Sequence, residues 1–285
     1  MRNFKKVLSV LLIGGLLVFA FAGCQNKSGK NQSEGQDSTK ALSGTVATNG
    51  STSMEKVINS LSEQFMKDNK DVTVTYDPTG SGTGIETVSN GKCDIGLASR
   101  NLKDSEKGLK STTLALDGIA IIVNKDMNVE DLTVEKIADI FTGKIKNWKE
   151  LGGEDLKISC IGRESGSGTR DGFESVTKTT DKCVLSQELT STGAVISAVA
   201  NNKNAIGYAS LSTVEGQNGI KAVKVGGVEC TEENIKNGTY AVQRPFILVL
   251  KEDAKLSEAA QAFVDYITSK DAAELIRSAG AVPVV

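Results

Sequence analysis

Apolar and polar positions follow two different periods along this chain. Residues 72–76 are apolar at every second position, which predicts a strand buried on one face. Between Met54 and Phe65 the apolar residues recur every three or four positions, which predicts an amphipathic helix. The two patterns alternate, and the segments between them are rich in Ser, Thr and Gly. The chain is therefore expected to repeat a unit of strand, loop and helix.

This alternation predicts an α/β fold with largely parallel strand pairing. The predicted strands are 45–48, 72–76, 94–98, 118–123 and 246–250. The predicted helices are 54–65, one through 85–88, 259–267 and 272–276. In such sheets, ligands are bound beyond the carboxyl ends of the strands, which is where the Ser/Thr/Gly loops fall.

The folded part is long enough for two cores. The long apolar runs at 118–123 and 246–250 place two crossings between lobes, at about 113–118 and 241–246. The first lobe is then predicted to consist of 41–115 plus 246–285, and the second lobe of 116–245.

The first residues are typical of an export signal. A positively charged start and an apolar stretch at 7–22 predict a signal peptide over 1–23, and the stretch is too short for a convincing permanent span. It ends in Phe21-Ala22-Gly23-Cys24, which resembles a bacterial lipobox with Cys24 as the lipidated residue; an uncleaved anchor is the alternative. Residues 25–40 contain no apolar side chain, so 24–40 is predicted to be a flexible tether. These features predict a domain outside the cytoplasmic membrane, held to it by Cys24.

Composition excludes several classes of function. The formal net charge is −2, which disfavours nucleic-acid binding. The chain has no histidine, so a Ser-His-Asp triad is impossible and the commonest metal ligand is missing. The cysteines have no metal-ligand spacing, although a Cys183–Cys230 disulfide is an alternative for an exported protein. No metal and no organic cofactor are predicted.

The segment Gly162-Arg-Glu-Ser-Gly-Ser-Gly-Thr-Arg170 follows the apolar run 158–161 and is the strongest functional signal. Glycines let the backbone approach a ligand closely, hydroxyls add short donors, and an arginine fork matches a tetrahedral oxyanion. A loop of this kind at the start of a helix is a cup of hydrogen-bond donors. It predicts a phosphate site.

At this point the chain resembles the phosphate-binding lipoproteins that serve phosphate ABC transporters, within the type 2 periplasmic-binding-protein fold. The resemblance covers nearly all of the mature domain. The resemblance is carried by six segments and by their order and spacing along the chain: Gly50-Ser51-Thr52-Ser53, Thr79-Gly80-Ser81-Gly82-Thr83-Gly84, Cys93 to Arg100, Ile140 to Trp148, Arg163 to Thr169 and Asn204 to Tyr208.

The resemblance implies a two-lobed fold with a two-segment hinge and a ligand set drawn from both lobes. The implied phosphate ligands are Thr52, Ser53, Ser81, Arg163, Ser167, Gly168 and Thr169. The third loop departs from the enterobacterial pattern, because it ends in Ser99-Arg100 where those members have Ser-Asp. We expect Arg100 to point at the anion as a second cation, which leaves Glu164, Asp94 or a hydroxyl oxygen as the acceptor of the phosphate proton.

Simpler roles compete with these. Thr52 and Glu55 have the spacing of a capping box, and Ser81 has the composition of an ordinary turn residue. Arg163 has a potential partner in Glu164. Trp148 is expected to be a packing anchor.

The sequence thus predicts a monomeric, lipid-anchored receptor that captures inorganic phosphate and delivers it to an ABC-type permease. A receptor for sulfate or molybdate shares nearly all of these donors and is the alternative, and an adhesion or scaffold module is another. A surface phosphatase or esterase is disfavoured, because neither a nucleophile elbow nor a P-loop is present.

Overall fold

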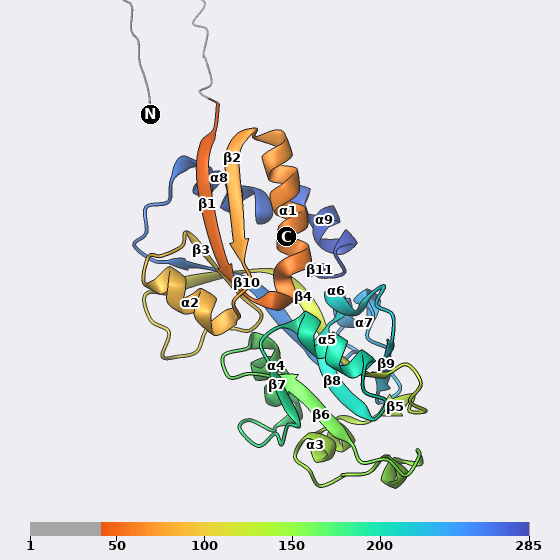
Figure 1. Ribbon diagram of the computed structural model, residues 1–285. Helices are drawn as coiled ribbons and strands as arrows, with labels where there is room; N and C mark the ends of the chain where they lie inside the picture. Colours follow the sequence, from red (N-terminus) through yellow and green to blue (C-terminus); the bar gives the residue numbers. More distant parts are fainter. Residues whose placement is uncertain (1–40, 285) are drawn as a thin grey trace, which may run out of the picture. The chain divides into compact units, whose positions relative to one another are not determined.

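The computed structural model describes residues 41–284 (Figure 1). The predicted signal peptide, Cys24 and the tether lie outside the described residues. The strands are β1 (Ser43–Gly50), β2 (Asp71–Asp77), β3 (Ile95–Ala98), β4 (Leu109–Asn124), β5 (Asp131–Leu132), β6 (Ser159–Arg163), β7 (Gln187–Leu189), β8 (Ala205–Ser210), β9 (Ile220–Val225), β10 (Gln243–Lys251) and β11 (Val282–Pro283).

Helices separate most of these strands. The α-helices are α1 (Glu55–Asp68), α2 (Ser81–Ser89), α3 (Val134–Phe141), α4 (Gly168–Thr177), α5 (Thr192–Ala200), α6 (Leu211–Val214), α7 (Glu232–Lys236), α8 (Glu258–Ile267) and α9 (Ala273–Ser278). Short 3₁₀ turns occur at η1 (Thr52–Met54), η2 (Trp148–Leu151) and η3 (Lys270–Ala272).

The long strand β4 belongs to two sheet regions, and this divides the fold into two lobes (Figure 1). From Leu109 to Gly118 it pairs with β10, and from Ile119 to Val123 it pairs with β8. The first lobe contains β1, β2, β3, β10 and β11, and the second contains β5 to β9. The change of partner occurs where β10 begins at Gln243, opposite Gly118.

The sheet is mixed rather than largely parallel, which corrects the sequence prediction. The outer strands pair in parallel, as β1 does with β2 and β3, and as β6 does with β7 and β8. The two strands at the crossing, β4 and β10, pair antiparallel with each other and with their other neighbours. A strand that leaves one lobe and another that returns must run in opposite directions.

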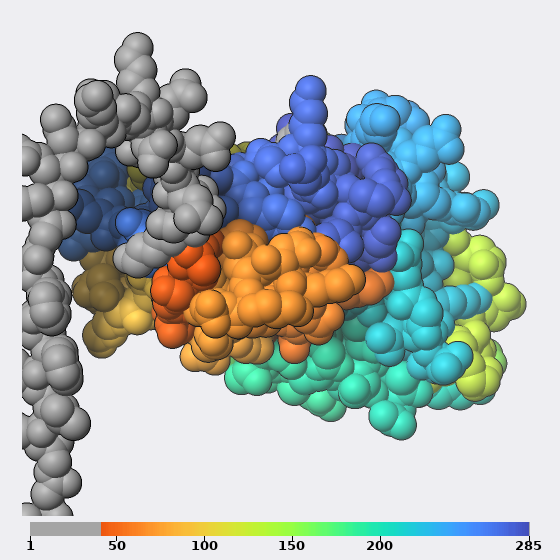
Figure 2. Space-filling model, turned by 90° about the horizontal axis from the view of Figure 1, so that it is seen from above, coloured from red at the N-terminus to blue at the C-terminus, as the bar shows by residue number. Residues whose placement is uncertain are grey.

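The core of the first lobe joins both ends of the described chain. Phe65 of α1 packs edge-on against Phe263 of α8, with ring centroids 5.1 Å apart. The orange segment of α1 accordingly lies beside the blue C-terminal segment in Figure 2. The helical spacings at 54–65 and 259–267 therefore arise from one shared core.

The second lobe has an aromatic core of its own. Phe173 of α4 stacks on Tyr208 of β8, with ring centroids 4.2 Å apart. Trp148 is fully buried in the same cluster, and its indole N–H donates to the Asn204 carbonyl at 3.0 Å. The prediction that Trp148 is a packing anchor is confirmed.

The cysteines outside the N-terminal segment are free thiols. Cys183 Sγ contacts Thr179 Oγ1 at 3.4 Å, whereas Cys230 lies beside Gly118 and Ile235. The alternative of a Cys183–Cys230 disulfide is therefore wrong for this structure. Burial raises the pKa of the Cys183 thiol to about 11.

Candidate functional site

The first lobe presents three loops at one edge of its sheet, because β1, β2 and β3 are parallel and end together. Gly50 closes β1 with a φ of 146°, and a Cβ at this position would lie 2.0 Å from the Leu97 carbonyl oxygen of β3. Only glycine permits this approach. It brings the start of η1 against the end of β3.

Thr52 and Ser53 follow this glycine and are buried. Ser51, not Thr52, is the cap of this turn, since its hydroxyl accepts from the Ser53 backbone N–H at 3.3 Å. Helix α1 itself has no side-chain cap. The capping-box interpretation of Thr52 and Glu55 is therefore wrong, and the Thr52 hydroxyl is available for other contacts.

Ser81 begins α2 and faces the end of β3. Its Oγ accepts from the Ser99 backbone N–H at 3.0 Å and lies 3.2 Å from Ser99 Oγ. Ser99 Oγ also accepts from Ser51 Oγ at 2.8 Å. The three loops of the first lobe are thus joined by hydroxyl groups.

The second lobe presents Arg163 at the end of β6. Its guanidinium is fixed by the Leu189 and Thr190 carbonyls, at 3.0 and 2.9 Å, and 1 % of the residue is exposed. Burial lowers the pKa of Arg163, and the charge of Glu164, 3.5 Å away, opposes that shift. Arg163 is therefore a buried cation supported mainly by carbonyl oxygens.

Hydroxyl groups from the two lobes meet at this arginine. Arg163 Nη1 donates to Thr52 Oγ1 at 3.0 Å, and Ser53 Oγ lies 2.8 Å from Thr169 Oγ1 of α4. Thr192 lies at the start of α5, and its Oγ1 is 3.1 Å from Thr52 Oγ1 and 3.0 Å from Ser53 Oγ. Hydrogen bonds therefore connect both lobes in one buried cluster.

At Gly168 the two lobes lie too close together for a side chain. A Cβ on Gly168 would lie 2.4 Å from Ser81 Oγ and 2.6 Å from Ser99 Oγ. Ser167, just before it, is buried and caps α4 by accepting from the Arg170 backbone N–H at 3.4 Å. We use the term donor cluster for the residues joined here: Thr52, Ser53, Ser81, Ser99, Arg163, Gly168, Thr169 and Thr192.

Arg100 is not directed into the donor cluster, contrary to the sequence expectation. Its Nη1 and Nη2 donate to the Glu106 carboxylate at 2.9 and 2.7 Å. Its Nε lies 2.8 Å from Asp171 Oδ2 on α4. The strand end was predicted correctly, but two nearby carboxylates hold the side chain instead.

The sequence reasoning missed a second buried arginine. Arg244 of β10 donates from Nη1 to Thr169 Oγ1 at 2.9 Å and to the Ser99 carbonyl at 3.3 Å. Its Nε and Nη2 donate to Asp117 Oδ2 of β4 at 3.2 and 3.0 Å. The sequence did contain a signal for this pair. Each predicted crossing has one charged residue, and the two charges are of opposite sign: Asp117 lies in 113–118 and Arg244 in 241–246.

The expected proton acceptors lie at the margin of this site or outside it. Asp94 accepts from the Ala47 backbone N–H at 2.8 Å and is committed to β1. Glu164 is partly exposed and contacts Arg163. Within the described residues, no carboxylate is hydrogen-bonded to the hydroxyls of Thr52, Ser53, Ser81 or Thr169.

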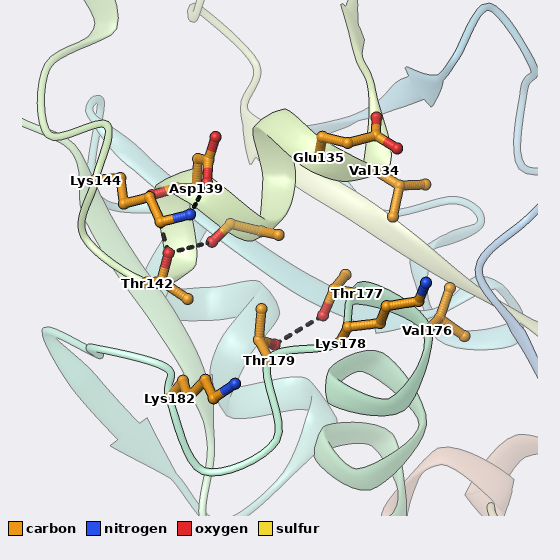
Figure 3. A pocket seen from close by; sticks show the side chains of 11 residues that line it. Val134, Glu135, Asp139, Thr142, Lys144, Val176, Thr177, Lys178, Thr179 and Lys182 are labelled. Carbon is orange, nitrogen blue, oxygen red and sulfur yellow. Dashed lines mark hydrogen bonds and ion pairs between the residues drawn. The ribbon is translucent and has the colours of Figure 1, made fainter.

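An open surface pocket of about 610 Å³ lies elsewhere, between α3 and the end of α4 (Figure 3). Lys144 Nζ forms an ion pair with Asp139 Oδ1 at 2.8 Å, and Thr177 Oγ1 is hydrogen-bonded to Thr179 Oγ1 at 2.7 Å. These polar groups are satisfied by one another. Across residues 41–284, no group of His, Cys, Asp and Glu is arranged to hold a metal ion.

Comparison with known proteins agrees with this architecture. Residues 35–271 match a family model described as a PBP superfamily domain. The phosphate-binding protein PstS of Bacillus subtilis (strain 168) is 32% identical over 291 residues, covering 100% of this chain and 95% of the relative. The chain therefore belongs to the PBP superfamily, and within it to the family of phosphate-binding PstS proteins.

Solved structures agree in fold. A Clostridium perfringens protein, described as a phosphate ABC transporter substrate-binding protein with bound phosphate, is 43% identical with a TM-score of 0.81. The match covers 85% of this chain and 100% of that one. An ABC-type phosphate transport receptor from Vibrio cholerae is 33% identical with a TM-score of 0.68, covering 83% and 99% of the two chains. The fold is thus the two-lobed type 2 periplasmic-binding-protein fold, as predicted.

Proposed function

We propose that this protein is an extracytoplasmic receptor that captures inorganic phosphate between its two lobes and delivers it to an ABC-type permease. The observation that carries this proposal is the meeting of buried hydroxyls from both lobes at Arg163, with Ser53 Oγ 2.8 Å from Thr169 Oγ1 and Arg163 Nη1 3.0 Å from Thr52 Oγ1. The phosphate bound to the similar Clostridium perfringens protein supports the same ligand class. Family membership supports a receptor rather than an enzyme.

The ligand set in this proposal comes from the donor cluster and from Ser167, which lies beside it at the start of α4. Hydroxyl and backbone N–H groups at the starts of η1, α2 and α4 surround the anion, since helix starts present unpaired N–H groups and favour negative charge. Arg163 supplies the charge-assisted bonds. The proposed ligands are Thr52, Ser53, Ser81, Arg163, Ser167, Gly168 and Thr169. Arg100 acts from outside this set, through Asp171, as an ion pair across the lobes.

Closure of the two lobes on the anion is the proposed mechanism of capture. The lobes are 41–115 plus 246–285 and 116–245, and β4 and β10 form the hinge between them. Closure excludes water, and hydrogen bonds to a charged ligand are stronger where the local dielectric is low. The closed, loaded form is the state that the permease recognises.

The attachment of the protein is also a proposal. In the part of the chain that the structure describes, no helix is long and apolar enough to cross a membrane. A lipid on Cys24 and a tether over 24–40 would hold the monomeric domain at the outer face of the cell membrane. Palmitate labelling of the wild type and of Cys24→Ala tests this, and equal labelling of the two would overturn it.

The phosphate site is tested by Arg163→Ala, measured by calorimetry on protein stripped of bound phosphate. Removing one partner of a buried charged hydrogen-bond network costs at least about 2 kcal/mol, so we expect phosphate affinity to fall by about 30-fold or more. Arg277→Ala is the matched control, because Arg277 is an exposed arginine paired with Glu274. Equal affinities of wild type and Arg163→Ala would remove Arg163 from the site.

A receptor for another tetrahedral oxyanion is the second candidate. It is favoured by the lack of a carboxylate among the hydrogen-bond partners of the four ligand hydroxyls, within the described residues. A carboxylate would accept the proton of phosphate and repel fully ionised sulfate. Calorimetry with sulfate and with molybdate separates the candidates. A phosphate receptor binds neither anion at a concentration at which phosphate saturates the site.

A further inference from the structure

Arg244 and Asp117 form a buried ion pair at the hinge, directly across the β10–β4 ladder from each other. Asp117 is fully buried and 4 % of Arg244 is exposed. Asp117 Oδ2 accepts from Arg244 Nε and Nη2, and Asp117 Oδ1 accepts from Ser210 Oγ at 2.6 Å. The carboxylate therefore fixes one edge of the guanidinium.

The other edge of the guanidinium reaches both lobes. Nη1 donates to the Ser99 carbonyl of the first lobe at 3.3 Å and to Thr169 Oγ1 of the second lobe at 2.9 Å. Helix α4 rests on the same side chain, because a Cβ on Gly172 would lie 3.3 Å from Arg244 Cδ. Arg244 thus contacts the hinge, the loop after β3 and the start of α4.

This contact determines how the Thr169 hydroxyl is used. A hydroxyl has one O–H donor and two acceptor lone pairs, and a guanidinium only donates. The Arg244 N–H occupies one of the two lone pairs of Thr169 Oγ1, so the O–H of Thr169 points away from Arg244 and is free to donate to Ser53 Oγ, 2.8 Å away, or to a bound anion. Arg244 therefore favours Thr169 as a donor.

We propose that Arg244, held by Asp117, is a positioning residue of the phosphate site. It orients the Thr169 hydroxyl as a donor to the anion, and it couples this orientation of Thr169 to closure of the two lobes. This inference rests on the proposed function. It assigns Arg244 no direct contact with the ligand. A purely structural ion pair, or a cation that acts on the anion by charge alone, would not act through Thr169.

A double-mutant cycle tests this in the otherwise wild-type chain, with melting temperatures recorded because Arg244→Met leaves the buried Asp117 carboxylate without its partner. Arg244→Met and Thr169→Val are made singly and together, and phosphate dissociation constants are measured by calorimetry on the full mature chain. We expect each single change to weaken binding about 10- to 100-fold, the range of a charge-assisted hydrogen bond. We expect Arg244→Met to have at least about five-fold less effect when Thr169 is already Val. Equal effects in both backgrounds would overturn the proposal.

Arg244→Lys, in the otherwise wild-type chain, provides a second measurement. Lysine keeps the charge but lacks the fork that contacts Asp117 and Thr169 together, so we expect binding to stay weak and to be insensitive to Thr169→Val. Wild-type affinity in Arg244→Lys would mean that only the charge matters and would overturn the inference. This variant also serves if Arg244→Met does not fold, and melting temperatures monitor stability in each case. Failure of the wild type to bind phosphate would instead overturn the proposed function.

Discussion

Gly168 lies at a contact between the two lobes that leaves no room for a side chain. A Cβ there would lie 2.4 Å from Ser81 Oγ and 2.6 Å from Ser99 Oγ, across the lobe boundary. The position is the first of α4, where alanine is a better helix former than glycine. Gly168→Ala should therefore leave the free energy of unfolding unchanged or slightly higher, while it holds the lobes apart.

We expect Gly168→Ala to weaken phosphate binding about ten-fold or more, since overpacking a tight contact costs about 1–3 kcal/mol. Calorimetry gives the affinity and thermal denaturation gives the stability. Gly193→Ala is the matched control, because Gly193 also lies at the start of a helix and its Cβ would meet no atom within 4 Å. Equal affinity of Gly168→Ala and Gly193→Ala would show that the lobes do not need this approach.

The sequence predicted which residues belong to the donor cluster better than it predicted their partners. Thr52, Ser81 and Gly168 stand in loops whose composition is typical of anion sites, and the fold brings these loops together. The prediction for Arg100 was wrong because the end of a strand fixes where a side chain leaves the backbone but not which partner that side chain contacts. Arg244 was missed because its partner Asp117 is 127 positions away and becomes adjacent only through the β4–β10 register.

At the scale of elements, the loop after β3 is held to α4 by charges. Arg100 pairs with Glu106 within the loop and with Asp171 on α4, and Lys103 Nζ lies 3.0 Å from the same Asp171 oxygen. Burial alone would raise the pKa of Glu106, but hydrogen bonds from Arg100 and from the Lys103 backbone N–H outweigh it, so the pKa is lowered. Glu106 therefore stabilises the folded state when it is ionised.

The sign of the pH dependence follows from this lowered pKa. The contribution of Glu106 is fully present above its unfolded pKa of about 4.3 and is lost as the pH falls through the lower folded value. We expect Glu106→Gln to reduce the free energy of unfolding by about 1–2 kcal/mol at neutral pH, with the difference from wild type shrinking below about pH 4. Urea denaturation across this range measures it, and a constant difference at all pH values would contradict the assignment. Glu258→Gln, at an exposed position of α8, is the control.

The positions of the helices and strands could be predicted from periodicity, whereas their pairing could not. The apolar spacings at 54–65 and 259–267 identify α1 and α8, because a helix buried on one face shows its period in any topology. The prediction of largely parallel pairing was wrong because β4 and β10 each read as a buried apolar run. Such a run does not indicate strand direction.

For the whole molecule, the contacts between lobes define the closed form. Backbone, hydroxyl and charged groups all cross the boundary: Gly82 N–H donates to the Gly166 carbonyl at 2.9 Å, Ser53 contacts Thr169, and Arg100 pairs with Asp171. Two of these residues, Ser53 and Thr169, are proposed ligands of phosphate. In the proposed mechanism the anion offers acceptors to donors on both lobes, and it therefore stabilises the closed form by its differential affinity for that form.

The domain from residue 41 onward should therefore become more compact when phosphate binds. Small-angle scattering of phosphate-free and phosphate-saturated protein should show a smaller radius of gyration in the saturated sample, since hinge closure brings the lobes together. Arg163→Ala is the informative control, because it removes the cation that reaches Thr52 of the opposite lobe and should leave the open profile unchanged at the same phosphate concentration. Identical wild-type profiles with and without phosphate, in samples where calorimetry shows binding, would mean that the anion enters lobes that are already closed. The contacts between lobes would then be a permanent feature of the fold, and capture would depend on the motion of individual loops.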